Sequence, residues 1–393
     1  MQNNPFNIAK TYPGDGTISN PGSQIGQKIG LIDATSNYVT DGRFDIGKFS
    51  KLHRQLTVVD GYSATVDIEE LMRGGINVVV QAFGPEEEYV RTEPDSDPSV
   101  EPPRGSRSWR PYFEGAELVE RIEIAIAEHQ AFAEAYKDSI EIANDGADIL
   151  RIVASGKIAM VLMLVSGFIA DSIAVLHRFH ELGVRVMCPS HLSATSWADS
   201  SAELNDPPGL NDFGREVIQA CQEIGVLVDL AHCSDYTCKD TLSISTRPMI
   251  ATHTKARGIT NSLRDMPDEI LRGVADTGGV ICVLAPTGRT QQERHMARLS
   301  RDQILTKNYA DPFERARAKL ANAQVWATKL DLSTIDHVVR VAGIDHVGLS
   351  SHAQNVPQWI EFTESLIDHG YNEDDVGKIL GGNVVRVLQE TIG

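Results

Sequence analysis

Residues 225–253 read GVLVDLAHCSDYTCKDTLSISTRPMIATH and contain the pattern that decides the fold. Two short apolar runs, GVLVDLAH and PMIATH, each end in a histidine, and a longer, more polar stretch separates them. Runs of about four to eight residues that are rich in Val, Ile and Leu are typical of strands buried on both faces of a parallel sheet. The stretch therefore predicts two parallel strands joined by a crossover.

The same rhythm extends over most of the chain. Further apolar runs lie on both sides of the quoted stretch: LTVVDG, INVVVQAF, IAMVLMLV and VRVMCPS before it, and GVICVLA and DHVGLSS after it. Helix-like segments such as ELVERIEIAIAEHQAFAEAYKDSIEIAND and LNDFGREVIQACQEIG lie between the runs. Strands that alternate with helices in this way predict an α/β fold, a (β/α)8 TIM barrel over residues 56–393. The competing doubly wound sheet would normally show a glycine-rich phosphate loop after an early strand, and the sequence has none.

Two segments fall outside this alternation. Residues 1–55 are polar and rich in Gly, Asn and Pro, and the sequence around Asp41-Gly42 predicts a short β-hairpin in a small N-terminal extension. Residues 86–112 are rich in proline and charge and follow the second predicted strand. We expect them to form a loop at the barrel rim, either a lid or a solvated insertion.

Composition excludes several classes of partner and location. The 393 residues include 36 Lys and Arg and 54 Asp and Glu, which gives a formal net charge of −18. A nucleic-acid or anionic-membrane binder needs a cationic face, so neither partner is expected. No run approaches the roughly 20 apolar residues of a membrane-spanning helix, and the N-terminus lacks the features of a secretory signal. The five scattered cysteines fit reduced thiols, so we expect a cytoplasmic protein.

Ionisable side chains recur where the predicted strands end, which is where a barrel places its chemistry. Four of the 12 histidines follow separate strands: His191, His232, His253 and His352. Tyr62 follows the first strand. Neutral imidazole is the commonest protein ligand for borderline divalent metals, and three converging rings can hold zinc. Carboxylates are missing from these strand ends, although a pair of metal ions needs an anionic bridge.

From about residue 56 to the C-terminus the chain resembles the membrane (renal) dipeptidase family, peptidase family M19, whose members are TIM-barrel zinc peptidases that cleave dipeptides and some related amides. The segments that carry this resemblance are VVDG, LMRGGINVVVQAF, ADSIAVLHRFHELGVRVMCPSHLSATSWADS, GLNDFGREVIQACQEIGVLVDLAHCSD, PMIATHTKARGITNSLRDMPDEILRGVADTGGVI, IDHVVRVAGIDHVGLSS and LGGNVVRVL. The resemblance implies a barrel of the metal-dependent hydrolase type and, since family members are often dimers, a homodimer.

Several positions that the resemblance marks as metal-binding carry other residues here. Tyr62 and Ala64 stand where the family has a His-x-Asp pair that binds one metal. Val165 or Ser166, depending on a one-residue gap, stands where the family has a bridging glutamate. His352 replaces an aspartate that handles protons. The resemblance therefore implies a degenerate metal site.

Other positions keep the residues of the family. His232 and His253 match the two histidines of the second metal, His191 matches a histidine that contacts the substrate, and Arg264 matches an arginine that binds the substrate's carboxylate. Two divalent ions close together repel strongly, and neutral histidines do not offset that charge. We therefore expect no dinuclear zinc site, but either one divalent ion, zinc, on His232, His253 and His352 or no metal.

Three hypotheses about function remain open. In the first, which we favour, Tyr62, His191 and His352 are catalytic groups in a reworked site, and Arg264 binds a small amino-acid- or peptide-derived carboxylate substrate. The reaction is then amide hydrolysis or a non-hydrolytic biosynthetic step. In the second, the chain is a catalytically inactive homologue that acts as a binding protein. In the third, it is a weak dipeptidase or amidohydrolase with one metal.

Overall fold

The computed structural model describes residues 51–84 except 65 and 67, and residues 89–91, 109–111, 114–284, 331–352 and 359–393. The hairpin predicted around Asp41-Gly42 lies outside the described residues. Most of the predicted rim loop, residues 86–112, lies outside them as well. Within that loop the structure has an antiparallel pair of short strands, β3 (Tyr89–Arg91) and β4 (Trp109–Pro111).

Each of the apolar runs forms a strand, and these strands pair in parallel. They are β1 (Val59–Ser63), β2 (Val78–Phe83), β6 (Ile158–Leu164), β7 (Val184–Met187), β8 (Leu227–Val228), β9 (Ile250–Thr254), β10 (Val280–Leu284) and β11 (Val347–Ser350). Every residue of β2 and β6 is buried. The uninterrupted apolar sequence of these runs is therefore explained by burial on both faces.

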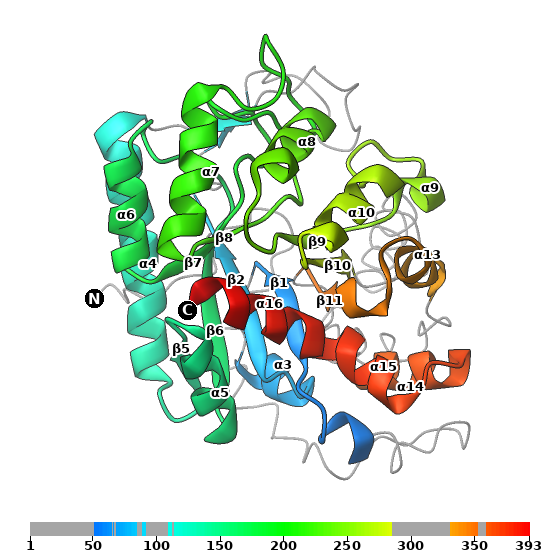
Figure 1. The fold of residues 1–393 in the computed structure, drawn as a ribbon. Helices are drawn as coiled ribbons and strands as arrows, with labels where there is room; N and C mark the ends of the chain where they lie inside the picture. The colour runs from blue at the N-terminus through cyan, green and yellow to red at the C-terminus, as the bar shows by residue number, and fades with distance from the viewer. Residues whose placement is uncertain are drawn as a thin grey trace, which may run out of the picture.

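The strands form two parallel sheets, with the orders β1-β2-β6-β7-β8 and β11-β10-β9. Contacts at two edges connect the sheets in the described part of the chain. A parallel bridge pairs Asp229, just after β8, with Ile250 in β9. At the other edge, the backbone N–H of His352, just after β11, donates to the carbonyl of Tyr62 in β1 at 3.1 Å. The fold is thus mixed α/β with parallel sheets that helices surround (Figure 1).

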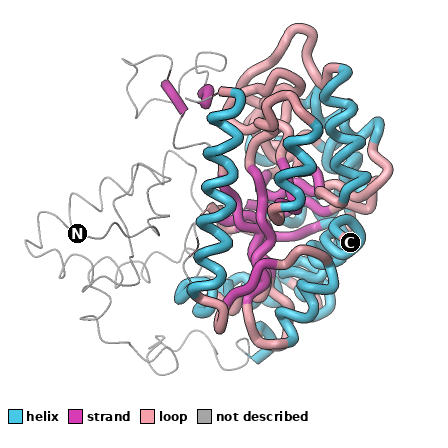
Figure 2. The backbone as a smooth tube through the Cα atoms, turned by 90° about the vertical axis from the view of Figure 1, so that its left-hand side faces the viewer, coloured by secondary structure: helices cyan, strands magenta, loops and turns pink. Residues whose placement is uncertain are grey.

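Helices lie on the outer sides of the strands, which run through the middle of the described residues (Figure 2). The longer helices are α4 (Gly115–Ala135), α5 (Gly146–Ala154), α6 (Ile173–Glu181), α7 (Asp212–Ile224), α8 (Asp235–Ile244), α10 (Asp268–Asp276), α13 (Ser333–Ala342), α14 (Trp359–His369) and α16 (Asn383–Ile392). The shorter ones are α3 (Ile68–Arg73), α9 (Arg257–Thr260) and α15 (Glu373–Gly377). None of the helices in the described ranges is long and apolar enough to cross a membrane.

The sequence signals of α7 show why a helix forms there. Asn211 accepts a hydrogen bond from the backbone N–H of Gly214 at 2.9 Å and so caps the first turn. Val217, Ile218 and Cys221 repeat at helical spacing and are buried. Gly225 ends the helix with a φ of 83°, a left-handed conformation that glycine adopts without strain. The helix predicted over LNDFGREVIQACQEIG is therefore confirmed.

The helix predicted over ELVERIEIAIAEHQAFAEAYKDSIEIAND is wrong in its last third. It ends at Ala135, and residues 140–142 form a short strand, β5 (Ile140–Ile142), which pairs in parallel with the start of β6. The sequence Ile-Glu-Ile has two β-branched side chains at strand spacing, and β-branched residues favour strands when a partner strand is available. Pairing with residues far along the chain therefore decides the local structure.

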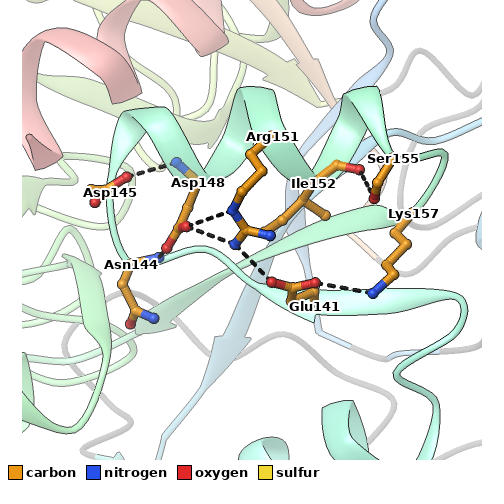
Figure 3. A network of polar contacts seen from close by, with 8 residues as sticks. All are labelled: Glu141, Asn144, Asp145, Asp148, Arg151, Ile152, Ser155 and Lys157. Atoms are coloured by element: carbon orange, nitrogen blue, oxygen red, sulfur yellow. Dashed lines mark hydrogen bonds and ion pairs between the residues drawn. The ribbon is translucent and has the colours of Figure 1, made fainter.

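A polar network fixes the turn from β5 into α5, at the end of the sheet where β6 begins (Figure 3). The carboxylate of Asp145 accepts a hydrogen bond from the N–H of Asp148 at 2.6 Å and caps α5. Arg151 bridges Asp148 and Glu141, at 2.7 Å each, and Lys157 contacts Glu141 at 3.1 Å. Hydrogen bonds from these two cations lower the pKa of Glu141. The network lies opposite the strand ends that carry the histidines.

Candidate active site

The histidines predicted at separate strand ends lie together. His191, His232, His253 and His352 form a row in which neighbouring ring centroids are 4.0 Å, 4.9 Å and 5.3 Å apart, in that order. Exposure of the first three side chains is 6%, 7% and 2%. The rings come from the ends of β7, β8, β9 and β11, so these strand ends bring them into one cluster, which is called the histidine pocket below.

Tyr62, from β1, completes the row. Its ring centroid lies 3.8 Å from that of His253 and 5.1 Å from that of His352, with interplanar angles of 34° and 27°. The first distance is shorter than the roughly 4.5–7 Å that is usual for aromatic pairs. Tyr62 is 1% exposed, so its ring fills the space beside His253.

His232 and His253 point their Nε2 atoms at each other, 2.9 Å apart. Two histidines on one tetrahedral zinc hold their nitrogens about 3.3 Å apart, because Zn–N bonds are about 2.0–2.1 Å long. Burial lowers the pKa of both rings well below the usual value, and the nearby charge of Arg264 acts in the same direction. Both rings are therefore neutral near pH 7, and the neutral form is the one that binds metal ions.

Asp60 is a fully buried carboxylate that joins the end of β1 to the end of β11. It accepts hydrogen bonds from the N–H of Tyr62 at 3.2 Å, from the N–H of Ser351 at 2.8 Å and from the hydroxyl of Ser351 at 2.5 Å. Burial raises its pKa to about 6, against the effect of these donors. Asp60 therefore binds its own strand through Tyr62 and the neighbouring strand end through Ser351.

Asp229 makes equivalent contacts between β8 and β9. It accepts hydrogen bonds from the N–H of Ala231 at 3.0 Å, from the N–H of Thr252 at 2.8 Å and from the hydroxyl of Thr252 at 2.7 Å. The oxygen of that hydroxyl lies 2.9 Å from Nδ1 of His253. The sequence did not reveal the role of Thr252, because threonine is common in strands and carries no signal of its own.

These contacts show which of the described side chains are available to bind a metal ion. Both buried aspartates already accept bonds from backbone and hydroxyl donors. Within the described part of the chain, no three His, Cys, Asp or Glu side chains form a group with the geometry to hold a metal ion. Among the described side chains, the neutral Nε2 atoms of His232 and His253 therefore face each other without forming a metal site of three or more ligands. Whether His352 joins the pair as a ligand stays a prediction.

Arg264 lies against the backbone of the same two strand ends. Its Nη1 donates to the carbonyl of Ala231, next to His232, and its Nη2 donates to the carbonyl of His253 at 3.2 Å. The guanidinium thus holds the two histidine-bearing segments together, a role that the sequence did not indicate. An arginine has five N–H donors, so further donors remain for a ligand. The predicted contact with a substrate carboxylate stays a prediction.

Comparison with known proteins gives one consistent result. The model of the membrane dipeptidase family (peptidase family M19) matches residues 23–392. Dipeptidase tcpJ of Claviceps purpurea is 28% identical over 390 residues, which cover 94% of this chain and 80% of that protein. Dipeptidase 3 of Rattus norvegicus is 26% identical over 287 residues, which cover 65% of this chain. The matched part spans about half of that relative, 53% of its length.

Solved structures agree on the fold. The probable dipeptidase PvdM from Pseudomonas aeruginosa has a TM-score of 0.66 at 21% identity, over 88% of this chain and 98% of that chain. A metallo peptidase from Rhodobacter sphaeroides, liganded with a phosphinate mimic of the dipeptide L-Ala-D-Ala, has a TM-score of 0.64 at 20% identity, over 86% and 99% of the two chains. At such identities the likeness shows the fold alone.

Asp60→Asn tests the bond between β1 and β11. The pKa of about 6 in the folded state exceeds the value of about 4 for an exposed aspartate, so folding favours the protonated form. The stability that Asp60 contributes is therefore complete below about pH 4 and is lost as the pH rises through about 6. Asn keeps the shape without the charge and is expected to remove this decline, of up to about 3 kcal/mol.

The measurement is urea unfolding of both proteins between about pH 4 and about pH 8. Asp138→Asn, at an exposed position before β5, is the control and is expected to follow the wild-type curve. Parallel curves for the wild type and Asp60→Asn would contradict this account of Asp60.

Proposed function

The chain belongs to the membrane dipeptidase family, peptidase family M19, and on that premise we propose that it is an enzyme with a reworked active site. Its substrate is a small amino-acid- or peptide-derived carboxylate that binds at the histidine pocket, and no pair of zinc ions takes part. The observation that supports this most is the contact of Tyr62 with His253, at 3.8 Å between ring centroids. The resemblance places a metal-binding histidine at position 62, and the ring found there packs on a retained histidine instead.

In this proposal the two sheets close into one (β/α)8 barrel. The bridge between Asp229 and Ile250 supports closure at one seam, and the hydrogen bond from His352 to Tyr62 supports it at the other. A closed barrel brings all the strand ends to a single mouth. This would explain why histidines from four strands share one pocket.

Charge balance is the reason for expecting at most one ion. Two divalent ions about 3.5–4 Å apart repel by on the order of 20 kcal/mol at an effective dielectric constant of about 20. Asp60 and Asp229 already bind other donors, so they are not positioned to offset this repulsion. His232 and His253, as neutral and converging donors, fit one divalent ion, zinc by family precedent. When bound, that ion would act as a Lewis acid on the substrate's carbonyl.

The remaining groups supply binding and proton transfer. Arg264 would bind the carboxylate of the substrate while it holds the backbone of His253, and His191 would contact the substrate beside His232. Tyr62 and His352 would carry out proton transfer. His352 has a φ of 52°, a left-handed conformation that is uncommon outside glycine and that clusters at functional sites. The hydrogen bond from its N–H to Tyr62 holds it in this conformation.

The substrate class is tested with carboxylates and Arg264→Ala. Dipeptides and N-acyl amino acids with a free carboxylate are expected to bind the wild type, whereas the matching carboxamides are not. A hydrogen bond to a charged group contributes about 1.5–3 kcal/mol, so Arg264→Ala should weaken binding by about 10- to 150-fold. Isothermal titration calorimetry measures the affinity. Arg272→Ala, at an exposed position on α10, is the control, and equal affinities for wild type and Arg264→Ala would overturn the anchor role.

The missing bridge is tested by restoring the first ligand pair alone. The double variant Tyr62→His with Ala64→Asp gains two ligands but keeps Val165 and Ser166, so we expect no dipeptide hydrolysis above the wild-type level. Adding Val165→Glu or Ser166→Glu supplies the carboxylate, and only these triple variants are expected to take up a second zinc, measured by mass spectrometry of the metal. Rapid dipeptide cleavage by the double variant would refute the proposal.

A further inference from the structure

A continuous chain of hydrogen bonds connects the buried carboxylate of Asp229 to two rings of the histidine pocket. Oδ2 of Asp229 lies 2.7 Å from Oγ1 of Thr252, which lies 2.9 Å from Nδ1 of His253, and Nε2 of His253 lies 2.9 Å from Nε2 of His232. Exposure of these side chains runs from 0% for Asp229 and Thr252 to 7% for His232. Because this chain of hydrogen bonds is buried, each polar atom has to find its partner inside the protein.

The protons on this chain of hydrogen bonds can be assigned by counting donors. An ionised Asp229 accepts all three donors around it, two N–H groups and the hydroxyl of Thr252, and these donors oppose the rise in its pKa that burial causes. The hydroxyl of Thr252 has one proton, and that proton is directed to Asp229. Towards His253 the oxygen of Thr252 can therefore only accept, so Nδ1 of His253 carries a proton.

The same count extends to the second ring. A neutral imidazole has one N–H and one bare nitrogen. With its proton on Nδ1, His253 has a bare Nε2, which accepts from the Nε2–H of His232. The two histidines therefore hold opposite tautomers in the metal-free protein, with the proton of His253 on Nδ1 and that of His232 on Nε2.

We propose that Thr252 is a positioning residue that sets the tautomers of His253 and His232. Its hydroxyl donates to Asp229, so its oxygen accepts the Nδ1–H of His253 and leaves the Nε2 of that ring bare for His232. Fixing the tautomer of a histidine through its second ring nitrogen is how proteins aim the first one at a metal ion or a substrate. The use of this arrangement in catalysis rests on the proposed function. The tautomers themselves are a property of the protein without metal or substrate.

Three variants isolate the hydroxyl of Thr252. Thr252→Val removes the hydroxyl with little change in shape, and Thr252→Ser retains it. Thr254→Val is the matched control, because Thr254 lies in the same strand, is 1% exposed and donates to the carbonyl of Lys255 instead of a ring. Circular dichroism verifies that each variant keeps the fold.

The readout is NMR of metal-free protein with ¹⁵N-labelled histidine, which separates protonated from bare ring nitrogens. The signals are assigned by their loss in His232→Asn and His253→Asn. We expect the wild type, Thr252→Ser and Thr254→Val to show Nδ1–H for His253 and Nε2–H for His232. In Thr252→Val the nitrogen signals of His253 should shift towards those of a ring that exchanges between its two tautomers.

Two results would overturn the inference. One is an NMR spectrum of the wild-type protein that places the proton of His253 on Nε2. This measurement tests the inference even if Thr252→Val does not fold. The other is a folded Thr252→Val protein that keeps the wild-type signals. Neither result depends on zinc content or on substrate binding, so failure of this inference and failure of the proposed function are distinguishable.

Discussion

Two divalent cations held close together need negative charge between them, and this requirement governs the proposed chemistry of the histidine pocket. The rings of His232 and His253 are neutral near pH 7, because burial and the charge of Arg264 lower their pKa values. Two buried carboxylates on the strands that carry these rings or pack beside them, Asp60 and Asp229, bind backbone and hydroxyl donors. Neutral nitrogens can bind one divalent ion, but they do not offset the repulsion between two. This shortage of negative charge separates the proposed chemistry from that of a two-zinc peptidase.

The same two aspartates explain how the fold supports the pocket. Asp60 binds Ser351 across the contact between β1 and β11, and Asp229 binds Thr252 across the contact between β8 and β9. These are the two places where the parallel sheets meet. Each aspartate lies close to a histidine of the pocket, so one buried carboxylate both joins strands and orients the segment that carries a ring. Changes at these positions are therefore expected to affect stability and chemistry together.

Much of the fold and part of the site could be predicted from the sequence. Apolar runs identified the strands of both sheets because strands buried on both faces have a continuous apolar sequence, and the strand ends identified the histidines. The strand β5 was missed, because Ile140 and Ile142 sit at the end of a helix-like stretch and pair only with distant residues. The roles of Thr252 and of the Arg264 guanidinium were missed because their partners include backbone atoms and carboxylates that only the fold brings near.

The number of zinc ions that the histidine pocket accepts tests the proposed function most directly. Crystals soaked in excess zinc chloride and measured on both sides of the zinc absorption edge would locate each ion by its anomalous scattering. We predict no more than one peak in the pocket, within bonding distance of His232 and His253. Two peaks about 3.5–4 Å apart, coordinated by side chains of the pocket, would contradict this prediction.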